Sequence, residues 1–296
     1  MTSVGKLNLL SVPIGHLGDI TIRAKEVLTS ATLFAVEDSR VFKKLLMGLG
    51  ISMEGKKIYS FHDHTPEKSI SLFIDYLKRG EDLYLVSDAG SPVISDPAYP
   101  LIRRVLDSGF EIKTVPGVSS LITALELSGL PPFPMHFFGF FPRTKEKRKQ
   151  VAKMLQEVSG TSIFFESPQR VRETMDELYD QLRVDGVKTK FVIARELTKK
   201  FESVYRFSGE EGEWNRVKDE IVYKGEFVVL IHRDNEGIGA VFEQNSGVVR
   251  EELTQIALRI LQEGGKPKLI AELLSSILRR DKKEIYDLMV SLSKKA

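Results

Sequence analysis

Short apolar runs alternate with amphipathic segments along the first 116 residues, and this alternation constrains the fold more than any other feature. The apolar runs cover residues 7–12, 32–38, 56–61, 82–88 and 111–117. The segments between them repeat their apolar residues with a helical period. Strands that are apolar on both faces and joined by helices are typical of a parallel sheet. The sequence therefore predicts a parallel α/β domain over residues 1–116.

Residues with strong positional preferences mark the ends of the helices in this domain. Asp19 and Asp96 stand where a helix N-cap is expected, and Pro97 suits a first helical turn. Gly80 and Gly109 follow the last apolar residues of two helical segments and are expected to end those helices.

The second half of the chain has a different order of elements. The segment 128–143 contains prolines and an aromatic cluster, which indicates the interior of a domain junction. Two helical segments follow at 145–160 and 170–183. Strand-like runs lie at 161–167, 190–197, 202–209 and 226–233. Because the last three runs follow each other without a helix, they are expected to pair antiparallel, in a mixed α/β domain over residues 117–236.

The last part of the chain reads as a separate helical unit. Residues 233–247 are polar and contain glycine, which is typical of a linker. Three amphipathic segments follow at 248–265, 266–280 and 281–295. The sequence predicts a small C-terminal helical domain over residues 245–296.

Composition excludes several classes of function. The chain has no cysteine, so it has no disulfides, no thiolate metal site and no cysteine nucleophile. With 43 Lys and Arg against 41 Asp and Glu, contact with a polyanion must come from local basic patches. The N-terminus has no basic segment before an apolar core, and no window approaches 18 apolar residues, which predicts a cytoplasmic protein with no membrane partner.

Five loops at the carboxyl ends of the predicted strands carry glycine, proline, serine and aspartate. They cover residues 12–19, 36–40, 61–64, 86–92 and 115–120. Ligands of open α/β sheets bind at this edge, where such loops converge. For any one loop, turn formation and helix capping explain the residues better. Taken together, the five loops favour a small-molecule site.

Known ligand motifs narrow the chemistry of that site. Neither a dinucleotide-binding glycine motif nor a P-loop occurs at the first loop, which argues against NAD-dependent chemistry and P-loop hydrolysis. In the segment His62, Asp63 and His64, the two histidines could bind a metal from one side of a strand. No further ligand is spaced to complete the set, so a polar strand end is favoured over a metal site and no metal is expected. Five basic residues in 143–150 indicate either a solvated helix start or a grip on phosphates beside the aromatic cluster.

The marked loops also resemble, in order, the signature segments of a known family. They read SVPIGHLGDIT, VEDSR, SDAGSPVISDPAYPL, VPGVSSLITALELSGLP, FFGFFPR, FFESPQR, ARELTKKFE and KGEFVVLI. The chain is similar over residues 5–232 to the ribosomal RNA small subunit methyltransferase I type of the tetrapyrrole methylases. The resemblance implies two α/β domains with the cofactor in the cleft between them, plus a small C-terminal helical domain.

The resemblance implies a reaction and partners. The expected activity is S-adenosylmethionine-dependent 2′-O-methylation of a cytidine ribose in the decoding region of 16S rRNA of the small ribosomal subunit, by a homodimer. Alternatives that stay open are a tetrapyrrole C-methyltransferase of the same fold, a protein-modifying enzyme like the diphthine synthases, and a non-catalytic RNA-binding protein that senses S-adenosylmethionine.

The resemblance further implies roles for individual residues. Residues expected to bind the cofactor are Pro13, Ile14, Asp88, Gly90, Ser91, Ile94, Ser119, Ser120, Phe165 and Leu197. Residues expected to act in catalysis are Arg195, Glu196, Lys199 and Glu166. Residues expected to contact RNA are Arg143, Lys145, Lys147, Arg148, Arg170, Lys266, Arg279 and Arg280. Capping or an inter-strand ion pair explains each catalytic candidate equally well, and packing or dimerisation remains an alternative role for the C-terminal helices.

Several positions depart from the family pattern. His16, Ser39 and Ser91 replace Asn, Thr and Thr, and Val93 stands at a position that is often glycine. Most of these changes keep size or hydrogen-bonding capacity. Gln169 replaces a usual histidine, so any proton transfer by that histidine is absent from this chain.

Overall fold

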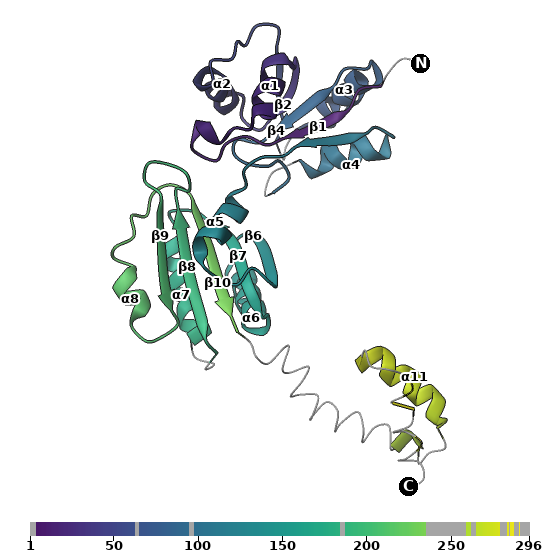
Figure 1. Cartoon of the computed structure of the whole chain (residues 1–296), viewed down its shortest axis with the longest axis vertical. Coiled ribbons are helices and arrows are strands. Elements are labelled where there is room, and N and C mark those ends of the chain that lie inside the picture. Colours follow the sequence, from purple (N-terminus) through teal and green to yellow (C-terminus); the bar gives the residue numbers. More distant parts are fainter. Residues whose placement is uncertain are drawn as a thin grey trace. The chain divides into compact units, whose positions relative to one another are not determined.

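The computed structural model describes residues 4–62, 65–94, 98–183, 187–234, 259–261 and 265–278, together with residues 283, 285, 286 and 290. The chain divides into two compact units, Met1–Arg233 and Asp234–Ala296. The first unit contains two five-stranded sheets (Figure 1).

The first sheet is entirely parallel, as the alternating pattern predicts. Its strands are β1 (Leu7–Leu10), β2 (Leu33–Val36), β3 (Lys57–Ser60), β4 (Leu83–Val86) and β5 (Ile112–Val115), in the order β3-β2-β4-β1-β5. Helices α1 (Ile22–Ser30), α2 (Ser39–Gly48), α3 (Glu67–Lys78) and α4 (Tyr99–Asp107) join the strands. Successive β2 residues belong to different core clusters, because Leu33 packs in the cluster of α3 and α4 and Phe34 in that of α1 and α2. Helices thus cover both faces, which explains why the inner strands β2 and β4 are apolar along their whole length.

The observed helix ends correct one prediction. Thr21, not Asp19, is the N-cap of α1, and its side chain accepts a hydrogen bond from the Ala24 amide. Asp19 lies in the short 3-10 helix η1 (Leu17–Asp19), which precedes the cap because the chain turns there before it extends at Thr21. Asp96 and Pro97 lie outside the described residues. Gly80 and Gly109 follow α3 and α4, as predicted.

The second sheet is mixed, in the order β6-β7-β10-β8-β9. Its strands are β6 (Met135–Phe140), β7 (Gly160–Glu166), β8 (Thr189–Arg195), β9 (Ser203–Ser208) and β10 (Phe227–Arg233). The predicted antiparallel pairing of the last three strands is confirmed. Segment 128–143, interpreted as a junction, instead contains the edge strand β6, whose pairing with β7 shifts register between Phe137 and Phe140. The four prolines of this segment and the irregular register of β6 interrupt the alternation from which a strand would be predicted.

Helices on the two faces of the second sheet have different roles. Helices α6 (Lys145–Glu157), α7 (Val171–Arg183) and α8 (Glu213–Val217) share the larger hydrophobic cluster with one face. Helix α5 (Ser120–Ser128) packs on the other face, in a cluster that also contains Ile14 from the loop after β1 and Leu197 from the turn after β8. The expected boundary at residues 116 and 117 falls between β5 and α5 and stays a prediction.

In the unit Asp234–Ala296, helix α11 (Pro267–Leu278) agrees with the helix expected over 266–280. Ile270, Ala271 and Leu274 form a small apolar cluster with Ile285. Most of the other two expected helices lies outside the described residues. Within the described part of the chain, no helix is long and apolar enough to cross a membrane.

Candidate functional site

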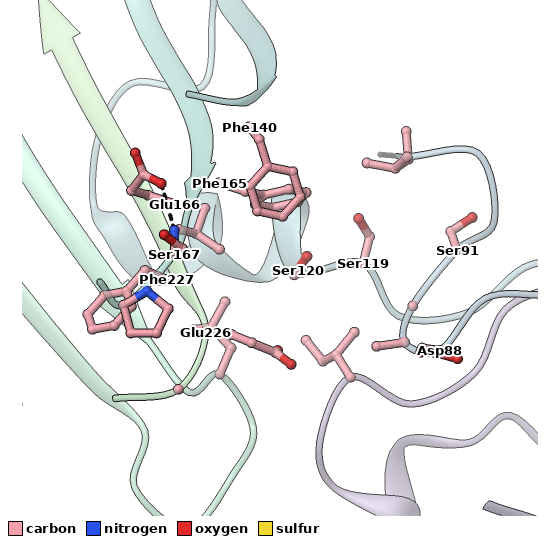
Figure 2. Close-up of a pocket in the computed structure, with 18 of the residues that line it drawn as sticks. Asp88, Ser91, Ser119, Ser120, Phe140, Phe165, Glu166, Ser167, Glu226 and Phe227 are labelled. Carbon is pink, nitrogen blue, oxygen red and sulfur yellow. Dashed lines mark hydrogen bonds between the residues drawn. The ribbon is translucent and has the colours of Figure 1, made fainter. Parts of the chain in front are cut away.

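A pocket of about 410 Å³ lies where the loops of the first sheet face the strand ends of the second sheet (Figure 2). This volume is within the range of small-molecule sites. Residues of the first side are Ile14, Glu37, Asp88, Ala89, Gly90, Ser91, Ile94, Ser119 and Ser120. Residues of the second side are Phe140, Phe165, Glu166, Ser167, Pro168, Leu197, Gly225, Glu226, Phe227 and Val228.

Backbone hydrogen bonds hold the first and fourth loops together. The Val12 amide donates to the Gly90 carbonyl at 2.9 Å, and the Gly90 amide donates to the Val12 carbonyl at 3.1 Å. Gly90 has a φ of +72°, and a Cβ there would lie 3.2 Å from Cγ2 of Ile14. Glycine therefore allows both this conformation and the close approach of Ile14. Val93 adopts a φ of +93° nearby, which is rare for a β-branched residue and agrees with the glycine usual at this position.

Two carboxylates of this wall hold each other's loops. The Asp88 amide donates to Oε2 of Glu37 at 3.0 Å, and the Asp38 amide donates to Oδ1 of Asp88 at 3.0 Å. Partial burial and the neighbouring charge of Glu37 raise the pKa of Asp88 above its usual 3.8. Asp38 differs, because hydrogen bonds from Arg40 lower its pKa to about 2. Asp88 and Glu37 thus concentrate negative charge in the pocket.

The N-terminus of α5 opens into the same pocket. Ser119 is the N-cap residue, its side chain makes no capping hydrogen bond, and Ser120 follows it in the lining. The first amides of a helix lack intrahelical acceptors and favour an anionic group. The pocket therefore offers backbone donors that could bind the carboxylate of a ligand, and it also contains acidic side chains that favour a positively charged group of a ligand.

An aromatic wall comes from the second sheet. The rings of Phe140 and Phe165 meet edge to face, with their centroids 5.5 Å apart. The ring of Phe137 also packs against Phe165, with 5.2 Å between the ring centroids. Phe165 was expected at the site, whereas Phe140 was not assigned to it. The sequence signal for Phe140 is the aromatic run 137–141. Because side chains alternate between the two faces of a strand, some of these rings must lie on the face that carries the pocket.

A seam joins the loop after β1 to the turn after β8. The His16 amide donates to Oγ1 of Thr198 at 3.1 Å. A Cβ on Gly15 would lie 2.4 Å from Cγ of Lys199 and 3.0 Å from the Leu197 carbonyl. Ile14 and Leu197 on either side of this seam both line the pocket. The seam therefore fixes the distance between the two walls.

The structure places every residue expected to bind the cofactor in the pocket lining except Pro13. Pro13 is buried beside Val12, where the bridge to Gly90 turns the loop. The side chain of Ile14, one residue later, reaches the pocket instead. Direct contact of these residues with the cofactor stays a prediction.

The four expected catalytic residues are used mainly in structural contacts. Arg195 is buried and donates to the carbonyls of Lys224 and Phe201. The carboxylate of Glu166 is fully buried and pairs with Arg170. Of the four, only Glu166 belongs to the lining, and Arg195, Glu196 and Lys199 do not. Hydrogen bonds to backbone carbonyls account for Arg195 and an ion pair accounts for Glu166, so a catalytic role of either stays a prediction.

Glu226, which sequence reasoning did not assign, lies in the pocket instead of Glu196 and Lys199. It forms an ion pair with Lys199, with 3.1 Å between Oε2 and Nζ. Gly225 and Phe227 beside it were also missed. The signal was the segment KGEFVVLI, which carried the resemblance although its polar residues had no assigned role.

Residues expected to contact RNA separate into two groups. Arg143, Lys145 and Lys147 are exposed at the start of α6, and Lys266 is exposed before α11. Arg148 is nearly buried and pairs with Glu173 and Glu177, and Arg170 binds Glu166 and backbone carbonyls. Because their guanidinium groups are already paired inside the domain, the structure gives no support to RNA contact by these two arginines, and that role stays a prediction. Arg279 and Arg280 lie outside the described residues.

The chain is similar to families of known activity. A profile of the tetrapyrrole (corrin/porphyrin) methylases matches residues 6–212. Ribosomal RNA small subunit methyltransferase I of Vibrio cholerae is 40% identical over 226 residues, covering 76% of each chain. The Xylella fastidiosa protein of the same name is 34% identical over 286 residues, covering 97% of this chain and 99% of its own. The similarity therefore extends over the C-terminal unit.

Solved structures share the fold at low sequence identity. A diphthine synthase aligns with a TM-score of 0.59 and 13% identity, covering 77% of this chain and 90% of its own. A uroporphyrin-III C-methyltransferase from Thermus thermophilus, complexed with S-adenosylhomocysteine, aligns with a TM-score of 0.51 and 16% identity, covering 77% and 97%. These likenesses confirm the predicted fold of two α/β sheets with helices.

The pocket suits S-adenosylmethionine in charge and shape. Four acidic residues, Glu37, Asp88, Glu166 and Glu226, line it, and the described lining includes no lysine, arginine or histidine. Asp88 and Glu37 would favour its positive charge, the start of α5 its carboxylate, and Phe165 with Leu197 its flat ring. When bound, this cofactor supplies a methyl group activated by a positively charged sulfur. No group of three or more metal-ligating side chains occurs among the described residues. The chain is an S-adenosylmethionine-dependent methyltransferase of the tetrapyrrole methylase family and belongs to the ribosomal RNA small subunit methyltransferase I branch of that family.

Proposed function

We propose that the protein methylates RNA of the small ribosomal subunit, and that the acceptor is the 2′-hydroxyl of a cytidine ribose in the decoding region of 16S rRNA. The observation that carries this proposal is the 34% identity to a ribosomal RNA small subunit methyltransferase I over nearly the whole of both chains. The acidic pocket with exposed basic residues on α6 is consistent with it.

The charges of the site indicate which parts of an RNA substrate could enter the pocket and which would stay outside it. A phosphate would be repelled by Asp88, Glu37 and Glu226, whereas a neutral ribose and base would not. Phosphates would instead contact Arg143, Lys145 and Lys147, which are exposed at the start of α6. The side chains of the pocket would then hold the ribose hydroxyl in line with the methyl group, and holding reactants in a reactive geometry lowers the barrier without further chemistry.

Incubation with S-adenosylmethionine labelled in its methyl group tests the proposal. Unmodified 30S subunits, naked 16S rRNA and a tetrapyrrole are offered as separate acceptors, and the label is mapped by nuclease digestion and mass spectrometry. We expect label on the ribose of one cytidine of 16S rRNA. Transfer to the tetrapyrrole alone would support a C-methyltransferase, and cofactor binding without transfer to any acceptor would support a non-catalytic protein. Either result would contradict the proposal.

Reversing charge at the start of α6 is expected to weaken substrate binding. The variant Arg143→Glu, Lys145→Glu, Lys147→Glu should raise KM for the ribosomal substrate at least tenfold and reduce its dependence on salt, because phosphate contacts release counterions. Calorimetry should find S-adenosylhomocysteine affinity within about threefold of wild type, where a tenfold difference equals about 1.4 kcal/mol. An unchanged KM would remove this helix from the RNA-binding surface.

The same proposal includes a homodimer, the assembled small subunit as a partner, and a cytoplasmic location, where ribosomes are present. Sedimentation equilibrium of the purified protein tests the dimer. A concentration-independent monomer mass would contradict it.

A further inference from the structure

We propose that Glu226 accepts the proton released by the acceptor hydroxyl, and that Glu196, Lys199 and Gly225 position it. This inference rests on the proposed function and identifies a residue that acts in it. It places the acceptor side of the reaction on the turn before β10.

The other pocket carboxylates are committed to contacts within the protein. Glu166 is fully buried and binds the Ser167 amide, the Thr174 hydroxyl and Arg170, and Figure 2 shows the first of these contacts. Glu37 and Asp88 accept hydrogen bonds from backbone amides of each other's loops. Glu226 extends from the second side of the pocket toward the side of Asp88 (Figure 2). Its side chain is 72% exposed, so an incoming substrate can reach it.

Glu196 fixes the backbone of Glu226 through two hydrogen bonds. The Glu196 amide donates to the Glu226 carbonyl at 3.0 Å, and the Glu226 amide donates to Oε1 of Glu196 at 3.0 Å. Lys199 then joins the side chains, with Nζ 2.9 Å from Oε1 of Glu196 and 3.1 Å from Oε2 of Glu226. Backbone and carboxylate of Glu226 are therefore both held from the turn after β8.

This arrangement requires glycine before Glu226. Gly225 has a φ of +90°, and a Cβ there would lie 2.4 Å from the carboxyl carbon of Glu196. Glu196 itself has a φ of +51°, a left-handed conformation that is disfavoured for a residue with a side chain. Such strain persists where surrounding contacts determine the conformation, and it is common at functional sites.

Lys199 is unsuited to accept the proton itself. Burial disfavours its charge, but the hydrogen bonds and charges of Glu196 and Glu226 outweigh burial and raise its pKa. It stays protonated at neutral pH and serves as a hydrogen-bond donor. Burial opposes the charge of Glu196 as well, yet the hydrogen bonds from Lys199 and the Glu226 amide lower its pKa. Glu196 is thus a charged anchor for both partners.

The chemistry needs a carboxylate that the acceptor hydroxyl can reach. The hydroxyl oxygen forms a bond to the methyl carbon while the carbon–sulfur bond breaks, and the electron pair of that bond goes to the sulfur. As the new bond forms, the hydroxyl proton becomes strongly acidic, and it passes to Glu226. The products are a methyl ether, a neutral thioether and protonated Glu226, so charge and atoms balance. Positioned proton transfer of this kind contributes roughly 10²–10⁴-fold to a rate.

The variant Glu226→Gln tests the inference, since it keeps the size of the side chain and removes its ability to accept a proton. Under single-turnover conditions with the ribosomal substrate, we expect the rate to fall roughly 10²–10⁴-fold. S-adenosylhomocysteine affinity and the unfolding midpoint should remain close to wild type.

Two further variants separate proton transfer from structure. Glu202→Gln removes an exposed carboxylate from the turn after β8, which also carries Lys199. The side-chain oxygen of the glutamine can still accept the hydrogen bond from the Thr198 amide, so the rate of this variant should match wild type. Lys199→Met should lower kcat without changing S-adenosylhomocysteine affinity, and Lys199→Arg should restore part of the loss. These two results would assign Lys199 to positioning.

The outcomes for the inference and the proposed function are distinguishable. If wild type fails to methylate any ribosomal substrate, the proposed function fails. If wild type methylates it and Glu226→Gln does so within threefold, the inference alone fails. A Glu226→Gln protein that loses S-adenosylhomocysteine affinity as strongly as rate would also overturn the inference, because Glu226 would then hold the cofactor.

Discussion

Replacing Gly15 by alanine is expected to weaken S-adenosylhomocysteine binding at least tenfold and to lower the free energy of unfolding by about 1–3 kcal/mol. The new Cβ would lie 2.4 Å from Cγ of Lys199, 2.8 Å from Oγ1 of Thr198 and 3.0 Å from the Leu197 carbonyl. The lysine side chain could move, but the carbonyl belongs to the backbone of the strained turn. The seam must therefore open, and Ile14 and Leu197 would move apart across the pocket.

Gly18→Ala is the matched control in the same loop. Its Cβ would lie 2.8 Å from Cε1 of the exposed His16 ring, and a side-chain rotation relieves this contact at the loss of the hydrogen bond from the Gly18 amide to Nδ1 of His16, without moving the seam. Calorimetry with S-adenosylhomocysteine and urea unfolding of both variants provide the measurements. Equal affinities for Gly15→Ala and Gly18→Ala would show that the seam does not set the pocket geometry.

Asp88→Asn is expected to reduce affinity for S-adenosylmethionine about tenfold, equivalent to about 1.4 kcal/mol. Affinity for S-adenosylhomocysteine, which carries one positive charge fewer, should fall less. The reason is electrostatic, since asparagine still accepts the Asp38 amide but removes the charge that Asp88 shares with Glu37 in the pocket. Competitive calorimetry with both ligands measures the difference, and equal losses would contradict this role of Asp88.

The dependence on pH follows from the raised pKa of Asp88. In the wild type, S-adenosylmethionine affinity should fall as pH drops through this raised pKa, at a higher pH than for an ordinary aspartate. The folded pKa of Asp88 lies above the unfolded value of 3.8, so ionisation of Asp88 destabilises the fold as pH rises above 3.8, and the effect is complete above the folded pKa. Asp88→Asn should therefore be slightly more stable than wild type at neutral pH. Solvent screening keeps this gain small. Asp38→Asn, which keeps an N-cap side chain outside the pocket, should leave S-adenosylmethionine affinity close to wild type. Because the pKa of Asp38 is lowered by Arg40, its charge stabilises the fold at neutral pH, so this variant should be slightly less stable, the opposite of Asp88→Asn.

Local patterns predicted most of the fold correctly. The parallel order of the first sheet follows from strands such as Leu33–Val36 that are apolar on both faces. The antiparallel pairing of β8, β9 and β10 was also predicted, although the short helix α8, which the sequence pattern did not reveal, lies between β9 and β10. Errors occur where local signals compete. Thr21 and Asp19 are both good N-cap residues, and the turn at Leu17 decides between them. Strand β6 was not predicted because the prolines on either side of it and its irregular register interrupt the alternation.

For the pocket, four of the five predicted loops contribute lining residues, the described part of the loop at residues 61–64 contributes none, and the catalytic roles stay predictions. Asp88, Gly90, Ser119 and their neighbours follow strands directly, so topology alone brings them to one edge. Polar residues on the second sheet have no such rule. Arg195, Glu196 and Glu226 are all polar residues near strand ends, yet one is buried, one is an anchor and one faces the pocket.

The sequence by itself determined most of the two sheets, the family and the loops that form the first side of the pocket, because these depend on periodicity and on motifs contiguous along the chain. Only the tertiary structure decided how charge is used. Arg148 is neutralised by Glu173 and Glu177, while Lys199 is placed between Glu196 and Glu226. Ion pairing depends on distances between residues far apart in sequence, and burial depends on the packing of the whole domain. Neither is encoded in the residue type, so the same charged side chains acquire structural or chemical roles only in the folded protein.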